Sequence, residues 1–418
     1  MDMSSVRVNV FDQMSKMIQY KIIKNRRFLD DEQLMQSEQM EVVEEVFNAN
    51  VREEELKELS SHFSGILCND HPTHLAIWGK TGTGKTLTCQ FFLKLLSEKC
   101  FQEKIPLIYK HLDLSTPRPC FRALNDLACL LSASRKYTKG ISTEEMMYRI
   151  EESLADFNGY FVLFVDECNH VINDTNKIFM TFLIRRLSQQ IPAKLILIFV
   201  SNQLNWPDNL QQRLKSFLKL NEIYFKPYNA IDLQHILHIR VEKALNHGFV
   251  ESGVIEKIAA MSSQEHGDAR KAVMLLAKSA YLAEKAKSKI TLDLVDKAID
   301  DLETDRYLKL LRSAPRQMQA AMTAVIKTVK QLKKNKVTTR ECFDAYRALC
   351  TRIGLRPLSQ RTFGAIISDM DIQLLIRSDV ISKGRYGRTR EISLDLSTDT
   401  VSKIYNTMLM ILNYESKN

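Results

Sequence analysis

The sequence is poor in the residues that interrupt regular structure. Its 418 residues include only 13 glycines and 9 prolines, and aromatic residues make up 8%. This scarcity excludes collagen-like and low-complexity chains and favours long helices over a sandwich of many short strands. A hydrophobic content of 45% also excludes wholesale disorder. At roughly 150 residues per domain, the length suggests two to three domains.

Membrane and secretion signals are also missing. No apolar run approaches the roughly 18 residues of a membrane span, and the N-terminus lacks the layout of a signal peptide. The eight cysteines include no C-x-x-C pair, which predicts reduced thiols in the cytoplasm rather than disulfides or zinc. Cys68, His71 and His74 are evenly spaced, but a metal needs a fourth ligand, so we interpret them as a polar loop.

The net charge of +9 is confined to one part of the chain. Residues 315–395 contain 16 Lys or Arg and 7 Asp or Glu, so this fifth of the chain carries the whole excess. Such localised positive charge suggests a polyanionic partner, nucleic acid before membrane.

Four apolar runs predict strands, at 74–78, 105–114, 160–165 and 194–201. Helical segments lie between them, one of them at 85–99 and another beginning at a capping box of Ser142 and Glu145. The runs 160–165 and 194–201 are apolar throughout, as strands buried on both faces should be. Strands that alternate with helices imply a parallel sheet.

The character of the chain changes after Pro227. Residues 229–312 have helical spacing throughout, and Asn229 with Asp232 provides an N-cap and a first-turn acid. We therefore expect a small helical domain. A break at 313–315 precedes a third unit of about 100 residues, with three helices and then a basic, glycine-containing ribbon.

The strongest local signal is a glycine-rich loop between a strand and a helix. It reads Gly79, Lys80, Thr81, Gly82, Thr83, Gly84, Lys85, Thr86 and matches G-x-x-x-x-G-K-[ST]. Backbone N–H groups of such a loop converge on phosphate oxygens at a helix N-terminus. Lys85 should reach the β- and γ-phosphates, and the Thr86 hydroxyl should bind Mg²⁺. A chance glycine turn would lack the flanking strand and helix.

Acidic and amide side chains follow the two buried strands. Asp166 and Glu167 end the run at 160–165, so they point into the ligand crevice. Asp166 can hold the metal, and Glu167 can orient or deprotonate the attacking water. Asn202 ends the next strand and can position the same water, although asparagine also starts ordinary turns.

These motifs, in this order, resemble a known family. GKTGTGKT, VLFVDE, FVSN, QRLKS, FKPY and HGDAR together look like an AAA+ ATPase, and the chain most resembles the archaeal replication-initiator family, related to the origin recognition complex and its loading factor. The resemblance implies an α/β fold: an AAA+ P-loop parallel sheet with a helical lid, followed by an α+β winged-helix domain. The expected parts are a helical segment packed on the base at 1–60, the base at 61–227, the lid at 228–312 and the winged helix at 313–418.

The resemblance also implies residue roles. Asn202 matches the first sensor, and Arg213 resembles the arginine finger that acts on a neighbour's nucleotide. Tyr228 would pack on the adenine, Arg240 would line the nucleotide pocket, and Arg270 matches the second sensor, which reaches the γ-phosphate. An arginine there neutralises charge that builds in the transition state. An isolated arginine would more simply make a surface ion pair.

The sequence departs from the family pattern in three places. Cys168 and Asn169 replace the usual second acid, and Phe217 stands where a small residue is common. The stretch LMQSEQMEVV at 34–43 lacks the His-Arg-Glu pattern expected before the first strand. These departures bear on metal coordination, hydrolysis and assembly through Arg213, and they leave nucleotide binding intact.

A helix at 359–371 with Ser359 as N-cap would present Gln360, Arg361 and Thr362 to the major groove. Arg361 suits guanine and Gln360 suits adenine. The segment 383–394 reads as a β-hairpin wing that can contact phosphates or enter the minor groove through Lys383, Arg385, Arg388 and Arg390. A solvated basic surface is the alternative.

A second DNA contact is expected on the helix within 115–131, through Arg118 and Arg122, although core packing explains that helix equally well. The sequence thus predicts a nucleoid-associated switch with slow ATPase activity that binds ATP or ADP with Mg²⁺. It would recognise double-stranded origin DNA and help to load the replicative helicase or regulate that step. Its expected partners are that helicase and paralogous initiators, and it would be a monomer when free that can assemble on DNA. Two alternatives remain open: a protein-remodelling or clamp-loader-type AAA+ subunit, and a DNA-binding repressor whose nucleotide is structural.

Overall fold

The computed structural model describes most of the chain, in two compact units. The described residues are 21–30, 33–34, 36–116, 119–132, 140–170, 177–203, 206–209, 215, 217–382, 388–394 and 396–415. The first unit extends to Leu292 and the second begins at Asp293. Among the described residues, no helix has the length and apolar character needed to cross a bilayer.

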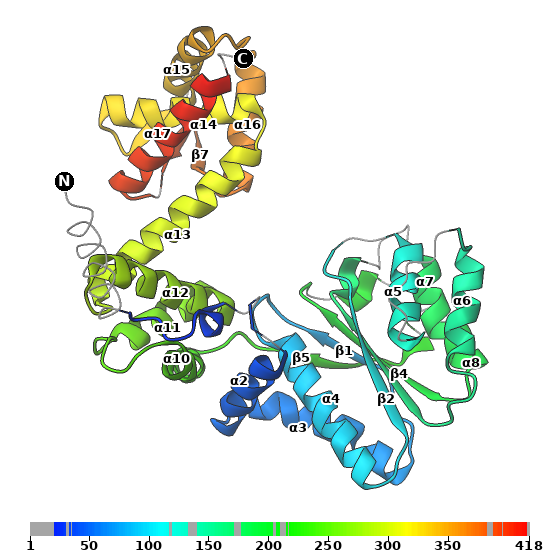
Figure 1. Ribbon diagram of the computed structural model, residues 1–418. Helices are drawn as coiled ribbons and strands as arrows, with labels where there is room; N and C mark the ends of the chain where they lie inside the picture. Colours follow the sequence, from blue (N-terminus) through cyan, green and yellow to red (C-terminus); the bar gives the residue numbers. More distant parts are fainter. Residues whose placement is uncertain are drawn as a thin grey trace, which may run out of the picture. The chain divides into compact units, whose positions relative to one another are not determined.

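A five-stranded parallel sheet forms the base of the first unit, as predicted. Its order is β2-β3-β4-β1-β5 (Figure 1). The strands are β1 (Leu75–Trp78), β2 (Leu107–Asp113), β3 (Tyr160–Asp166), β4 (Lys194–Ser201) and β5 (Asn221–Tyr224). Four of them coincide with the predicted apolar runs. The edge strand β5 escaped prediction because only Ile223 among its four residues is buried.

Helices cover both faces of this sheet. Alternate residues of β3 serve the two faces: Phe161 and Leu163 lie in one core, and Val162 and Phe164 lie in the other. The Phe164 face packs against α3 (Glu53–Phe63) and α4 (Lys85–Gln102). The Phe161 face packs against α5 (Cys120–Ser132), α6 (Thr143–Glu152) and the π-helical turn η5 (Phe182–Leu187). Burial on both faces explains the uninterrupted apolar runs.

The lid consists of α10 (Ala230–Ala244), α11 (Val254–Glu265) and α12 (Ala269–Ala286). Its start is the predicted cap. The Asp232 amide donates to Asn229 Oδ1 at 2.8 Å, and the Asn229 amide donates to Asp232 Oδ2 at 3.3 Å, which completes a capping box. At α6 the expected box is half formed: Ser142 accepts from the Glu145 amide, and no return bond from the Glu145 side chain is part of the cap.

Residues 21–29, which we call the N-terminal strap, pack on the lid. The Lys24 amide donates to Ala244 O at 2.7 Å, and the Asn246 amide donates to Ile22 O at 2.9 Å. The amides of Ile22 and Ile23 both donate to Glu284 Oε1. From the strap, α2 (Gln36–Asn48) leads to α3 on the base. The sequence predicts that the N-terminal segment packs on the base; its described part also contacts the lid, where Ile22 and Phe28 are buried.

The second unit combines helices with a small antiparallel sheet of order β6-β8-β7. Its elements are α13 (Leu292–Ser313), α14 (Arg316–Leu332), β6 (Lys336–Thr338), α15 (Thr339–Arg352), α16 (Gln360–Ile372), β7 (Arg377–Ser382), β8 (Arg388–Ser393) and α17 (Thr398–Glu415). The predicted break at Pro315 separates α13 from α14. Nevertheless α13 belongs to this unit, because Leu311 is buried in its core and Tyr307 and Leu308 pack against it.

The expected hairpin starts earlier than the sequence suggested. Strands β7 and β8 pair antiparallel from Arg377 with Ser393 to Ser382 with Arg388. The basic tip, 383–387, lies outside the described residues.

His74, at the boundary between the expected polar loop and the first strand, has a structural role. Its Nδ1 accepts a hydrogen bond from the Leu197 amide at 3.1 Å, next to the start of β1. Burial, aided by repulsion from His71 and His62, lowers the pKa of His74 to about 4. Only an unprotonated Nδ1 can accept this bond.

We therefore expect stability to fall in acid. The unfolded chain takes up a proton on His74 near pH 6.5 and the folded chain near pH 4, so the free energy of unfolding should decrease as pH falls through this window. His74→Asn keeps an acceptor without the proton and should flatten the profile. Urea unfolding followed by tryptophan fluorescence at pH 7 and 4.5 measures this. Exposed His247→Asn is the control, and an unchanged slope in His74→Asn would contradict the assignment.

Candidate nucleotide site and nucleic-acid surface

The glycine-rich loop connects β1 to α4, as predicted. Gly82 and Gly84 adopt φ of 73° and 80°, and Gly84 is the N-cap of α4. The Lys85 amine folds back over the loop and donates to Gly79 O at 2.9 Å and Lys80 O at 2.8 Å. The Thr83 hydroxyl also donates to Lys80 O, at 2.9 Å. Thr81 is exposed in the same loop. These three bonds help to hold the backbone of the loop in place.

Opposing charges surround Lys85. Its burial lowers the pKa of the Lys85 amine, the carboxylates of Glu167 and Asp166 oppose that shift, and the Arg270 cation adds to it. These effects place the P-loop lysine, both acids and the predicted second sensor within electrostatic reach of one another.

A hydroxyl and a carboxylate meet beside the loop. Thr86 Oγ1 donates to Asp166 Oδ2 at 2.7 Å, and the Glu167 amide donates to Asp166 Oδ1 at 2.9 Å. His111 on β2 is also near this carboxylate, with its Nε2 3.6 Å from Asp166 Oδ2. Mg²⁺ prefers oxygen ligands and usually takes one or two carboxylates plus phosphate oxygens, so this pair fits the ion. Among the described residues, no group of three or more His, Cys, Asp or Glu is placed to bind a metal by itself.

The tip of α12 touches the phosphate loop. The Ala269 amide donates to Gly82 O at 3.1 Å, and a Cβ on Gly82 would overlap the Asp268 carboxylate. Asp268 in turn caps α12 by accepting from the amides of Arg270 and Lys271. Arg270 is exposed and stands at this tip, one residue from the loop contact.

Tyr228 lies over the other glycine of the loop. It is 6% exposed, and a Cβ on Gly84 would overlap its hydroxyl oxygen. One face of its ring carries the guanidinium of Arg52, with Cζ 4.0 Å from the ring centroid. That face is not available for stacking on adenine. Burial raises the pKa of the Tyr228 phenol, and the Arg52 cation opposes the rise.

Arg52 is a site residue that sequence reasoning missed. It immediately precedes α3 and is buried. The residues that surround its side chain are Thr83, Lys226 and Tyr228, which lie far from it in the sequence. No local pattern therefore pointed to it.

Asn202 and Arg240, two further residues of the predicted site, also lie in the first unit. Asn202 follows β4 and is half-buried. Arg240 is 4% exposed on α10, and its Nη1 donates to Phe28 O of the N-terminal strap at 3.1 Å. Arg213 lies outside the described residues, so the finger stays a prediction.

On the second unit, the start of α16 is open to solvent. Ser359 accepts from the Thr362 amide as N-cap, and Gln360, Arg361 and Thr362 are exposed, while Phe363 and Ile367 are buried. Arg390 is turned inward: its Nη1 donates to Gly364 O at 3.3 Å and to the Ser368 hydroxyl.

Several predicted DNA contacts cannot be compared with the structure. Arg118, Lys383, Arg385 and the side chain of Arg388 lie outside the described residues. Arg122 is exposed on α5, whose opposite side packs Ala123, Leu124 and Leu127 into the core.

A P-loop parallel sheet with a helical lid, joined to a three-stranded winged-helix unit, defines an AAA+ ATPase with a C-terminal winged helix. Family models agree in each part: "AAA domain" matches residues 68–205, "Cdc6 AAA+ ATPase-type lid domain" matches 234–300, and "CDC6, C terminal winged helix domain" matches 309–404.

Known relatives span nearly the whole chain. ORC1-type DNA replication protein 1 of Archaeoglobus fulgidus is 32% identical over 354 residues, 84% of this chain and 85% of that protein. The Sulfurisphaera tokodaii protein of the same name is 32% identical over 353 residues, 84% and 87% of the two chains. The solved structure of the Aeropyrum pernix ORC1 protein in complex with DNA aligns with a TM-score of 0.67 and 26% identity, covering 93% of this chain and 97% of that one. This chain belongs to the family of ORC1-type DNA replication proteins, which confirms the predicted resemblance and fold.

The packing of Tyr228 on Gly84 predicts a stability difference between two glycine variants. Gly84→Ala and Gly248→Ala both place a side chain at positive φ. This strain should lower the free energy of unfolding by about 1–2 kcal/mol in each variant. Only Gly84→Ala must also displace buried Tyr228, since nothing lies within 4 Å of a Cβ at Gly248. We expect an additional loss of about 1–3 kcal/mol in the free energy of unfolding, measured by urea titration. Equal losses would show that Tyr228 does not confine the loop.

Proposed function

We propose that this protein is an ATP-dependent initiator that binds Mg²⁺·ATP between base and lid, hydrolyses it slowly and recognises duplex origin DNA through its winged helix. The observation that carries this proposal is the arrangement at the phosphate loop. The Lys85 amine, the Thr86–Asp166 pair and the lid tip with Arg270 all lie at the glycine-rich loop.

Each residue has a role at the triphosphate. The amide groups of Gly82 to Thr86 would bind phosphate oxygens at the N-terminus of α4. Lys85 would exchange its two carbonyl partners for the β- and γ-phosphates, and Thr86 with Asp166 would hold Mg²⁺. Bound Mg²⁺ neutralises phosphate charge. Glu167 and Asn202 would place the attacking water, and Arg270 would sense the γ-phosphate from the lid.

The winged helix would grip DNA through its exposed cations. Arg361 and Gln360 stand at the open N-terminal end of α16, the end that a recognition helix presents to base edges. Arg390 would act through α16 by fixing its position, because its side chain is bound to that helix. The likeness to an ORC1 protein solved with DNA supports this role. Loading of the replicative helicase and contact with paralogous initiators belong to the same proposal.

The first test concerns Glu167. Glu167→Gln keeps the size of the side chain but removes the base that activates water, so ATP should still bind while its hydrolysis falls by about 10²–10⁴-fold. Single-turnover hydrolysis and filter binding separate the two quantities. Glu103→Gln, which removes an exposed acid paired with Lys99 on α4, is the matched control. Normal turnover in Glu167→Gln would exclude the assigned role.

The second test concerns the DNA contact. Arg361→Ala should weaken binding to duplex DNA and reduce the slope of log affinity against log salt by about 0.9 if Arg361 lies against a phosphate. Lys403→Ala is the control, because Lys403 is already neutralised by Asp301 at 2.8 Å in the same unit. Fluorescence anisotropy at several salt concentrations gives both slopes. Equal affinity and slope in Arg361→Ala and the unaltered protein would remove α16 from the interface.

A further inference from the structure

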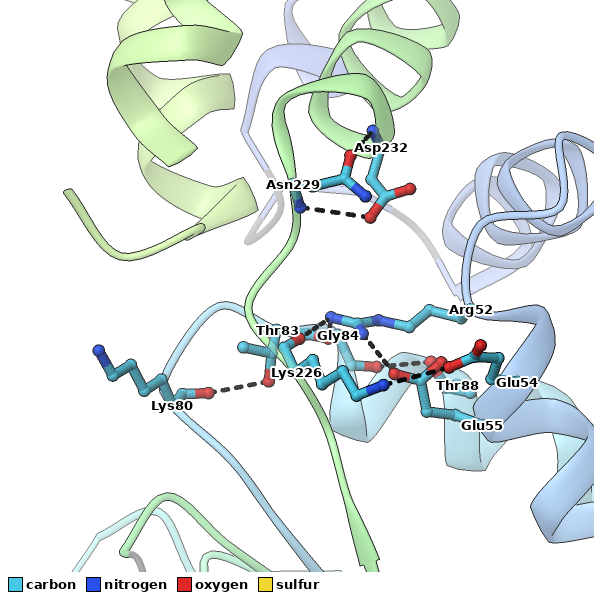
Figure 2. Close-up of polar contacts among 10 residues, drawn as sticks. All are labelled: Arg52, Glu54, Glu55, Lys80, Thr83, Gly84, Thr88, Lys226, Asn229 and Asp232. Carbon is cyan, nitrogen blue, oxygen red and sulfur yellow. Dashed lines mark hydrogen bonds and ion pairs between the residues drawn. The ribbon is translucent and has the colours of Figure 1, made fainter. Parts of the chain in front are cut away.

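Arg52 is a buried cation with an unusual backbone. It is 8% exposed and adopts φ 67° and ψ 24° as the N-cap of α3. A left-handed conformation is strained for a residue with a side chain, because its Cβ lies too close to the following carbonyl oxygen. Such strain persists where the surrounding structure holds it, and it gathers at functional sites. Here it directs the Arg52 side chain away from α3 and toward the phosphate loop (Figure 2).

The guanidinium joins two separate parts of the chain. Its Nη2 donates to Thr83 O in the phosphate loop at 3.0 Å and to Lys226 O at 2.5 Å, in the linker between β5 and the lid. Its Nη1 donates to Glu55, and its plane covers the ring of Tyr228. A single nitrogen thus bridges the loop and the lid linker, so a small shift of either carbonyl breaks a bond.

The bond to Thr83 also orients the loop. In a trans peptide the carbonyl and the following N–H point in opposite directions. With Thr83 O held by Arg52, the Gly84 N–H points away from Arg52. This N–H belongs to the set of donors that a phosphate loop offers its anion. The linker makes a second contact with the start of α3, because the Lys226 amine donates to Glu54 at 3.3 Å (Figure 2).

Stability alone does not account for this cluster. A buried ion pair loses its hydration, and apolar residues of similar size would often stabilise a protein as well or better. Among the described residues, Nε of Arg52 has no hydrogen-bond acceptor, which is a further cost. The arrangement instead needs a planar, permanently charged group with several fixed donors, and lysine does not provide that.

We propose that Arg52 is a positioning residue that couples the phosphate loop to the lid. By holding Thr83 O and Lys226 O on one nitrogen, it transmits the loop geometry set by a bound nucleotide to the hinge of the lid. The lid tip then keeps its contact with Gly82. The proposal rests on the proposed function, since it requires nucleotide at the loop.

Amide hydrogen exchange of the full-length protein tests the coupling directly. The Ala269 amide, which donates to Gly82 O, reports on the lid tip, and a peptide covering 79–88 reports on the loop. In the unaltered protein, saturating ATP with Mg²⁺ should slow exchange in both peptides. In Arg52→Lys, ATP affinity should fall about tenfold, the loop should still be protected at saturation, and the lid tip should not.

Two further variants complete the experiment. Arg149→Lys, in an exposed ion pair with Glu145 on α6, should behave like the unaltered protein. Glu55→Gln removes the charge that orients Arg52 and should show a weaker form of the same uncoupling, so it carries the test if Arg52→Lys does not fold.

The outcomes separate the two proposals. Lid-tip protection in Arg52→Lys equal to that of the unaltered protein would overturn the coupling role and leave the proposed function standing. Faster exchange throughout the first unit without nucleotide would also overturn it, because Arg52 would then be merely structural. If ATP protects nothing in the unaltered protein, the proposed function itself fails and the coupling fails with it.

Discussion

The meeting of base and lid in the first unit depends on two glycines of the phosphate loop. At Gly82 and Gly84 the loop is bare, and this allows the lid to reach it: Asp268 and Ala269 contact Gly82, and the Tyr228 hydroxyl lies over Gly84. A single methyl group at either position would collide with the lid or its linker. The positive φ angles that phosphate binding requires therefore also create the space in which base and lid meet.

Electrostatics give that meeting point its selectivity. Lys85 and Arg270 supply two cations, and Asp166 and Glu167 supply two carboxylates within their reach. In the proposed function, a triphosphate would add more negative charge than the two cations neutralise, and a divalent ion beside Thr86 and Asp166 would balance it. Cys168, which follows the two acids, is fully buried, and burial raises the pKa of its thiol. The proposed ion would therefore be held by the Asp166 carboxylate and the Thr86 hydroxyl.

Sequence reasoning succeeded where local pattern and tertiary environment agree. The strands β3 and β4 are buried on both faces, so apolar runs predicted them. The phosphate loop and the cap at Asn229 are each formed by residues close together in the sequence, so local motifs predicted them. It failed where contacts between residues distant in the sequence determine the structure. Strand β5 has a single buried side chain, α13 joins the second unit through Leu311 near its far end, and Arg52 is buried by partners 31 to 176 residues away. The three glutamates that follow Arg52 at the start of α3 give no local sign that the arginine is buried.

The N-terminal strap gives the lid a second tether. One tether is the linker at Lys226, and the other runs from strap residues bonded to Ala244 and Glu284 through α2 to α3 on the base. A body attached at two separated points has an axis defined by those points. It can swing about that axis, while sliding and twisting are suppressed. Two attachments therefore leave the lid less freedom to rotate against the base than a single linker would.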